Sequence, residues 1–159
     1  MSDYDEIEMV RIRIKLHLPH RIDSVWAELT DWEANSNWIP QTRVTVTNQT
    51  LGAGTEFVGV SKVGPIVLED RMRVSNWSPP VEGKAAARVS KLGPVLFGDA
   101  GFELTADGEG TSLVWFENVN LKWQLITAVM KPVLTPIAWL LFRTALARFA
   151  KTLEVKPAG

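Results

Sequence analysis

The chain has 159 residues, of which 46% are hydrophobic and 22% charged, as expected for one globular domain covering residues 1–159. Its formal net charge of −1 lacks the basic excess of nucleic-acid-binding proteins, so we expect no nucleic-acid partner. The absence of cysteine excludes thiolate chemistry, and two histidines are too few for a histidine-rich metal site, so we expect no metal and no cofactor. The acidic N-terminus has no apolar segment of a secretory signal, which predicts a cytoplasmic location.

The first elements are a strand and two short helices. Apolar and polar residues alternate over residues 8–18, which predicts a half-buried strand that ends at Pro19. Residues 22–30 have an amphipathic helical pattern. A second short helical segment is expected over residues 32–38. It should end there, because the residue before Pro40 avoids the helical conformation.

Six further strands are indicated by short runs between Gly and Pro turns. The segment Ser78-Pro79-Pro80 is expected to be a loop. Without helices between them, the strands should connect as antiparallel neighbours. The predicted strands cover residues 43–49, 55–62, 66–76, 84–90, 96–106 and 111–121.

The C-terminal part changes to a helical pattern over residues 125–154. Pro132 and Pro136 are expected to kink or break its first third. Residues 133–142 are apolar nearly all round, but the prolines and Lys131 argue against a membrane-spanning helix. Three roles stay open for this segment: a gate over a pocket, a contact in a homodimer, or a transient contact with a membrane.

These elements predict an α+β fold. A curved antiparallel sheet of about seven strands would wrap around the long C-terminal helix, because a sheet and a helix each bury one apolar face against the other. The two short helices lie between strands 1 and 2. An apolar pocket is expected between the sheet and the long helix.

Four local motifs occur in an order that resembles a known superfamily. They are PHRIDSVWAELTDWEANSNWIP (residues 19–40), LGAGTEF (51–57), RVSNWSPP (73–80) and GTSLVW (110–115). In this arrangement the chain resembles the START/Bet v 1-like (SRPBCC) superfamily and its polyketide cyclase/dehydrase and lipid-transport branch. The resemblance implies the helix-grip fold over nearly the whole chain. Fold alone does not fix the function within such a superfamily.

Two carboxylates are the weak candidates for catalytic groups. In the strand 66–76, Asp70 has the same parity as the apolar residues, so it should face the pocket or the core and needs a partner there. One interpretation is that Asp70 is a pocket acid or a ligand anchor. The other is structural: a bulge turns Asp70 outward, or Asp70 has a structural partner such as Arg88 or a backbone N–H. The last strand is apolar on both faces, and either Glu117 or Asn118 must point inward.

The leading hypothesis is binding of a small, mainly apolar ligand such as a lipid, isoprenoid or polyketide. The alternatives are a polyketide cyclase or dehydratase, and an interaction protein with a vestigial pocket. Trp38 is expected near the pocket mouth. The candidate ligand-binding residues are Trp38, Phe57, Asp70, Met72, Phe102, Trp115, Phe116, Asn118, Met130, Leu134, Ile137 and Leu141.

Overall fold

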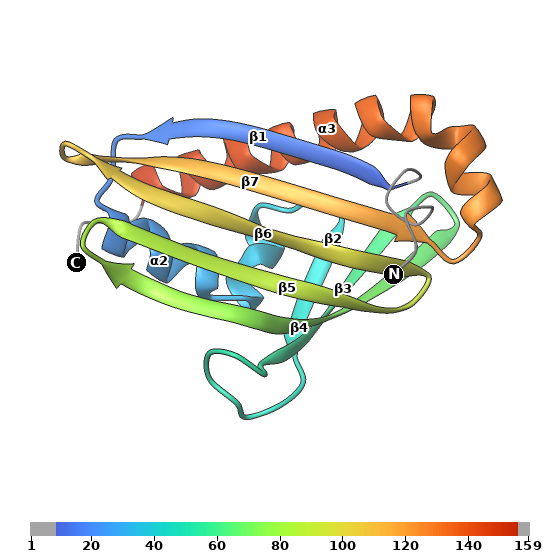
Figure 1. The fold of residues 1–159 in the computed structure, drawn as a ribbon, viewed down its shortest axis with the longest axis horizontal. Coiled ribbons are helices and arrows are strands. Elements are labelled where there is room, and N and C mark those ends of the chain that lie inside the picture. The colour runs from blue at the N-terminus through green and yellow to red at the C-terminus, as the bar shows by residue number, and fades with distance from the viewer. Residues whose placement is uncertain (1–8, 156–159) are drawn as a thin grey trace.

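The computed structural model describes residues 9–155, without the side chains of residues 63 and 124–127. The described residues contain seven strands, two α-helices and one 3-10 helix in an α+β arrangement (Figure 1), which confirms the predicted fold. The elements are β1 (Val10–Leu18), α2 (Ile22–Thr30), the 3-10 helix η1 (Glu33–Asn37), β2 (Thr42–Val46), β3 (Glu56–Val63), β4 (Ile66–Val81), β5 (Lys84–Pro94), β6 (Leu96–Asp107), β7 (Gly110–Leu121) and α3 (Gln124–Val155).

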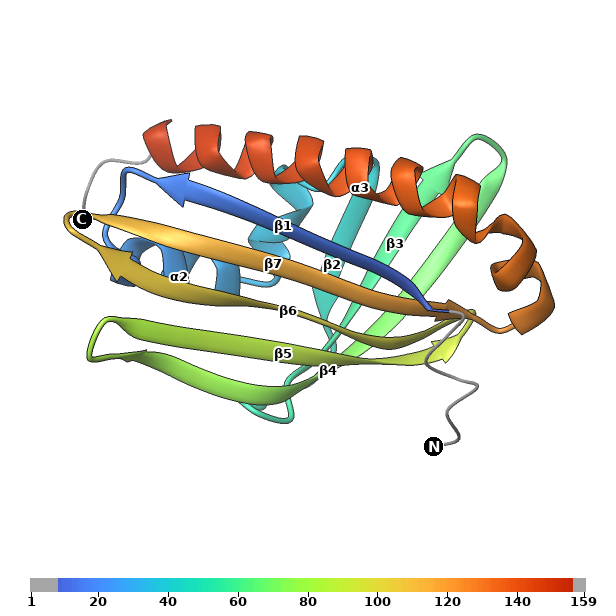
Figure 2. The same cartoon turned by 45° about the horizontal axis from the view of Figure 1, so that its top comes forward.

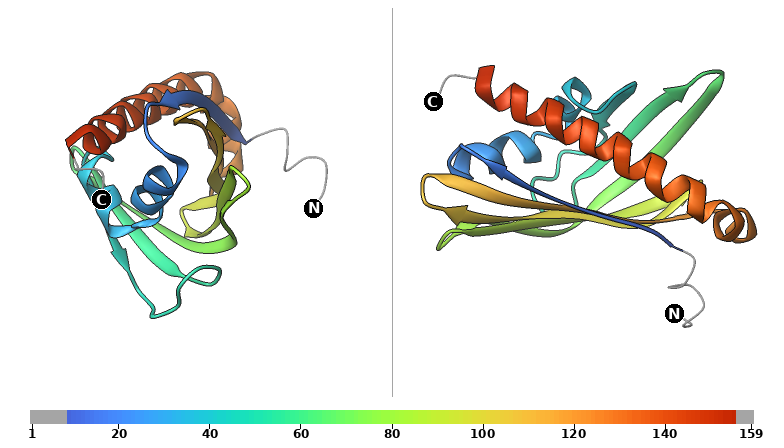
Figure 3. Two further views of the ribbon diagram at one scale, coloured as in Figure 1. Left: turned by 90° about the vertical axis from the view of Figure 1, so that its left-hand side faces the viewer. Right: turned by 90° about the horizontal axis from the view of Figure 1, so that it is seen from above.

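The sheet is antiparallel throughout, with the strand order β1-β7-β6-β5-β4-β3-β2. From β2 to β7 each strand lies beside the next in the chain, whereas β1 and β2 are the two edges. The connection from β1 to β2, which contains α2 and η1, therefore passes from one edge to the other. The end-on view in Figure 3 shows the sheet curving around α2, with α3 along the open side.

The main core fills the concave side of the sheet at one end. Alternation along β1 directs Ile12 and Ile14 inward, where they belong to the same cluster as Trp26 of α2. The second half of α3 completes this core, since Ala145 and Phe149 are fully buried. A smaller cluster lies under β2 to β6, formed by Val44, Phe57, Val74, Val89 and Ala100.

The helix α3 runs through Pro132 and Pro136 as one element, so the prolines do not break it. Its first turns bend away from the axis of the rest (Figure 2). By length and composition alone the segment Ala128–Val155 could cross a bilayer, with a mean hydropathy of 1.3. Its second half packs on the sheet, although only 17% of the most apolar window of this segment is buried.

Residues 128–141 of α3, which we call its first half, are covered much less well than the rest of the helix. Exposed apolar side chains occur on several of its sides, and the largest exposed fractions reach 60% or more. A helix that is apolar all round normally has neighbours all round. The exposed apolar residues of this segment are Val129, Met130, Val133, Ile137, Trp139, Leu140 and Leu141.

The ends of three strands differ from the prediction by three or more residues. β4 continues through Pro79 and Pro80, where the pairing with β5 shifts register and tolerates the missing N–H groups. β5 extends four residues beyond the predicted end at Ser90, to Pro94. β2 ends at Val46 instead of residue 49. The predicted start of β1 at Glu8 lies outside the described residues.

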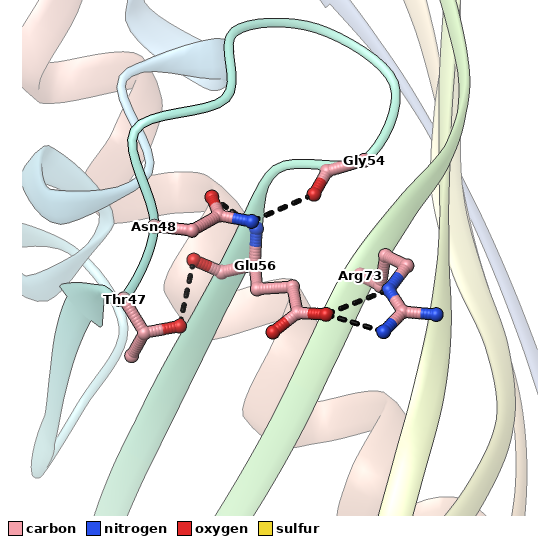
Figure 4. Close-up of polar contacts among 5 residues, drawn as sticks. All are labelled: Thr47, Asn48, Gly54, Glu56 and Arg73. Carbon is pink, nitrogen blue, oxygen red and sulfur yellow. Dashed lines mark hydrogen bonds and ion pairs between the residues drawn. The ribbon is translucent and has the colours of Figure 1, made fainter.

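The early end of β2 has a local cause, shown in Figure 4. The side chain of Asn48 donates to the carbonyl oxygen of Gly54 (2.9 Å) and accepts from the backbone N–H of Glu56 (3.0 Å). This amide therefore organises a loop in place of a longer β-ladder. Across the next strand pair, Arg73 Nε donates to Glu56 Oε1 over 2.8 Å and fixes the start of β3.

Candidate ligand-binding site

Three charged side chains from three strands meet on the concave face of the sheet. The ammonium group of Lys91 on β5 donates a hydrogen bond to Asp70 Oδ2 on β4 over 2.6 Å. The same nitrogen lies 3.6 Å from Glu117 Oε2 on β7. We call Asp70, Lys91 and Glu117 the acid–lysine cluster.

Small residues on β6 allow this contact between strands that are not neighbours. β5 and β7 lie on either side of β6, so their backbones are about 9–10 Å apart. On β6, Gly98 pairs with Lys91 and Ala100 pairs with Glu117. Neither carries a long side chain, and the ammonium and the carboxylate can therefore approach each other above β6.

Asp70 keeps its inward direction although the register shifts beside it. Asp70 pairs with Pro94 and Met72 pairs with Lys91, so the extra residue of the irregularity lies on β5. β4 itself continues its alternation, with Met72 half-buried and Val74 buried on the same face. The partner of Asp70 is Lys91, whereas Arg88 points to the other face and lies 3.5 Å from Asp99.

The cluster is buried, but its hydrogen bonding is incomplete. The side chains of Lys91 and Glu117 are 5% and 4% exposed, whereas that of Asp70 is 18% exposed and marks the side nearest to solvent. Asp70 Oδ1 is a buried oxygen without a hydrogen-bond donor, and Glu117 Oε2 has only the longer contact of 3.6 Å with Lys91. Buried polar atoms usually have a partner, so these two oxygens are acceptors to which a ligand could donate.

Burial dominates the acid–base behaviour of the cluster. It raises the pKa of Glu117 from 4.5 to about 7, against the opposing effect of Lys91, while the charge of Asp70 raises this pKa further. Burial lowers the pKa of Lys91, but the two carboxylates outweigh this effect and the pKa is raised. Lys91 is therefore an ammonium ion near neutral pH, and Glu117 is in the range where it exchanges a proton.

Aromatic side chains lie beside the cluster on the same face. Trp115 is two residues before Glu117 on β7 and stacks on Phe102 and on Phe142 of α3, with ring centroids 6.2 and 6.1 Å apart. Trp38 is fully buried between Trp115 and Phe149, so it belongs to the core and not to a pocket mouth. Its position directly after η1 holds the ring in the interior.

The other predicted site residues on β3, β4 and α3 are placed in different surroundings. Phe57 is buried and stacks on Trp32 at 4.6 Å, while Met72 Sδ lies 3.8 Å from Lys91 Nζ and so borders the cluster. Leu134 is partly buried against the main core. The remaining three, Met130, Ile137 and Leu141, are exposed on the first half of α3.

Phe116 and Asn118 lie on the outer face of the sheet, away from the cluster. Asn118 donates to Asp99 Oδ1 over 3.2 Å, and the guanidinium group of Arg88 lies 5.1 Å from the centre of the Phe116 ring. Two shallow hollows of about 280 and 250 Å³ flank Phe116 on this face. Between Glu117 and Asn118, it is Glu117 that points inward.

Lys91 is not among the sequence-based candidates, although the sequence contains a signal for it. Ala85, Ala87 and Val89 alternate on the inner face of β5, and Lys91 continues this parity. The predicted strand ends at Ser90, one residue too early for the alternation to include the lysine. The predicted strand therefore contains Arg88, and not Lys91, as the cation that a buried Asp70 requires.

Comparisons with known proteins agree with this architecture. Solved structures with the same fold include TTHA0849 from Thermus thermophilus (TM-score 0.75, 12% identity, 90% of this chain and 96% of that chain). The Zhui aromatase/cyclase from Streptomyces sp. R1128 has a TM-score of 0.70 at 18% identity, over 95% and 98% of the two chains. Human STARD10 has a TM-score of 0.72 at 11% identity, over 90% of this chain and 62% of its own. No curated protein matches the sequence.

The sequence profile of one protein family matches the chain over residues 9–154, which include every strand and nearly all of α3. The matched segment also contains the whole acid–lysine cluster. The chain therefore belongs to the family described as polyketide cyclase / dehydrase and lipid transport.

Proposed function

We propose that the chain binds a small, mainly apolar ligand, such as a lipid, an isoprenoid or a polyketide, between the concave face of the sheet and the first half of α3. The observation that carries the proposal is the acid–lysine cluster, whose two unpartnered oxygens are buried beside aromatic side chains. Ligand sites combine such apolar walls with a few convergent polar groups.

The position of the cluster supports the same proposal. It lies near the C-terminal ends of β5 and β7, at the end of the sheet where α3 begins. Here the helix exposes apolar side chains such as Met130 and Ile137, which a bound apolar molecule would cover. The family description includes lipid transport, and one similar structure is an aromatase/cyclase, so both lipids and polyketides are suitable ligand classes.

Native mass spectrometry of the freshly purified protein tests this proposal. We expect a stoichiometric apolar adduct that denaturing extraction releases. Ala100→Phe would place an aromatic ring on the concave face beside Lys91 and Glu117 and should reduce the adduct, whereas Thr105→Phe on the outer face of the same strand is the matched control. A bare mass that stays bare with a panel of lipids and polyketides would contradict ligand binding.

A second candidate is an enzyme of the cyclase or dehydratase type, and Glu117 is the observation that favours it. A buried carboxyl group with a pKa of about 7 is suited to move a proton near neutral pH. Asp70 and Lys91 would hold this group and the substrate in place. With a short poly-β-ketone thioester as substrate, Glu117→Gln should lower kcat and remove its pH dependence near neutral pH, and unchanged turnover would contradict this role.

The exposed apolar side of α3 is the basis of the third candidate, an interaction protein. Ile137 and Leu140 are 60% and 61% exposed, and a second copy of the chain or a membrane surface would remove them from water. Besides contact with a second copy or with a membrane, the remaining role proposed for this segment of α3 is a gate over the ligand. A cytoplasmic location remains a prediction.

A further inference from the structure

The acid–lysine cluster contains more negative than positive charge. Asp70 and Glu117 provide two carboxyl groups, and Lys91 provides the one ammonium group between them. The side chains next to it on the concave face, including Met72 and Ala100, are uncharged. The charge of the cluster is therefore −1 when Glu117 is ionised and zero when it is protonated.

An anionic group has no suitable position in this cluster. The Lys91 ammonium already donates to Asp70 over 2.6 Å and faces Glu117 at 3.6 Å. A carboxylate or phosphate of a ligand would have to compete with both carboxyl groups for this one cation. It would also be repelled by them in a buried environment where charges are weakly screened.

A cationic group is disfavoured for a different reason. An ammonium group that reached Asp70 Oδ1 or Glu117 Oε2 would come close to the ammonium of Lys91, which already lies against both residues. The two ammonium groups would repel each other, and this repulsion raises the free-energy cost of burying the ammonium group of the ligand. The cluster thus has carboxyl oxygens that can accept a further hydrogen bond, but it does not lack a cation.

An uncharged hydroxyl group fits both conditions. Asp70 Oδ1 has no hydrogen-bond donor, and Glu117 Oε2, which faces Lys91 at 3.6 Å, is a further acceptor when Glu117 is ionised. An alcohol or a phenol supplies one O–H donor per hydroxyl. We propose that the polar end of the ligand is an alcohol or phenol hydroxyl that donates to Asp70 or Glu117, and that ligands ending in carboxylate, phosphate or ammonium are discriminated against. This inference rests on the proposed ligand binding and specifies the chemistry of the same site.

Calorimetric titration with two matched series of compounds tests the inference. The aliphatic series is dodecanol, dodecanoate, dodecylamine and dodecane, and the aromatic series is naphthol, naphthoate, naphthylmethylamine and methylnaphthalene. At about pH 8 the hydroxyl groups are neutral, the acids and amines are charged, and Glu117 is largely ionised. We expect the alcohol of at least one series to bind about tenfold more tightly than its charged and hydrocarbon counterparts.

The outcomes separate this inference from the proposed function. Binding of a carboxylate, an amine or a hydrocarbon as tightly as the alcohol would overturn the inference and leave ligand binding established. Binding of none of the eight compounds would overturn both. Dodecyl phosphate tests the discrimination against phosphate groups, and we expect it to bind about tenfold more weakly than dodecanol. Equal binding of these two compounds would also overturn the inference.

Variants connect the preference to the cluster. Asp70→Asn and Glu117→Gln each remove a negative charge, so the preference for the alcohol over the carboxylate should fall by about tenfold. Glu103→Gln removes a charge from the exposed outer face of β6 and should leave the preference unchanged. Far-UV circular dichroism verifies that each variant is folded. An unchanged preference in both folded inner-face variants would overturn the inference.

Discussion

Lys91 and Asp70 form a hydrogen bond of 2.6 Å across two neighbouring strands whose register shifts beside them. The irregularity places the ammonium group of β5 over the carboxylate of β4 and within 3.6 Å of Glu117 on β7. One side chain thus neutralises charge from two strands. Removing it should leave two buried carboxyl groups facing each other.

The substitution Lys91→Met tests how much the contacts of Lys91 with Asp70 and Glu117 contribute to the free energy of unfolding. Methionine has a similar length but no charge, and breaking a buried ion pair from one side is costly, so the free energy of unfolding should fall by about 3 kcal/mol. Urea denaturation at about pH 8 measures it, where Glu117 of the wild type is largely ionised. Arg88→Met is the control, because Arg88 pairs with Asp99 on the exposed outer face and should cost no more than about 1 kcal/mol. Equal losses would contradict the role of Lys91.

The stability of the protein should depend on the protonation of Glu117. Its folded pKa of about 7 lies above the ordinary 4.5, so the folded chain keeps a proton that the unfolded chain loses between these values. The stabilising contribution is complete below about pH 4.5 and is lost as the pH rises through about 7. The loss is on the order of 3 kcal/mol, and it should be absent in Glu117→Gln.

Denaturation of the wild type and Glu117→Gln between about pH 4.5 and 8 measures this dependence. The difference between the two free energies of unfolding should change in favour of the variant as the pH rises. Because the same other groups titrate in both proteins, the difference isolates Glu117. A difference that is constant over the range would contradict the raised pKa.

Alternation along the strands identifies part of the site from sequence. It predicts that Asp70 points inward, and Asp70 does so because the nearby irregularity lies on β5 and leaves the parity of β4 intact. Alternation does not separate Glu117 from Asn118, since both faces of β7 bury large apolar side chains such as Trp115 and Phe116.

The remaining parts depend on contacts between distant strands. The approach of Lys91 to Glu117 requires small residues on β6, and no local pattern in β5 or β7 contains this information. The segments that contain prolines also show that local sequence signals do not fully determine the structure. Pro79 and Pro80 indicate a loop, but tertiary packing keeps them within β4, and Pro136 likewise lies within α3.

Gly98 should be sensitive to substitution because β6 and β7 approach closely there. Its φ of +119° is unfavourable for other residues, and an added Cβ would lie 2.0 Å from the backbone oxygen of Asn118. Gly98→Ala should therefore lower the free energy of unfolding by roughly 3 kcal/mol. Gly108→Ala is a matched control with a positive φ of +61° and no atom within 4 Å of the added Cβ, so it should cost about 1 kcal/mol. Thermal and urea denaturation compare the two, and similar losses would show that the close approach is not decisive.

The exposed apolar side chains of α3 should be dispensable for folding but necessary for contact with a second copy of the chain or with a membrane. Ile137 and Leu140 are largely exposed, so Ile137→Glu combined with Leu140→Glu should change the free energy of unfolding by no more than about 0.5 kcal/mol. Ala138 lies between them and packs against the core, so Ala138→Glu should be clearly destabilising.

Sedimentation velocity over a range of protein concentrations and flotation with phosphatidylcholine–phosphatidylserine vesicles measure the contact itself. We expect the wild type to self-associate or to float with vesicles, and the double variant to do neither, because two charges on the helix surface would have to be buried in either contact. A wild type that is monomeric at every concentration and does not bind vesicles would leave the apolar side without an external partner. The gate over the ligand would then be the role of this segment, and the double variant should instead weaken ligand binding.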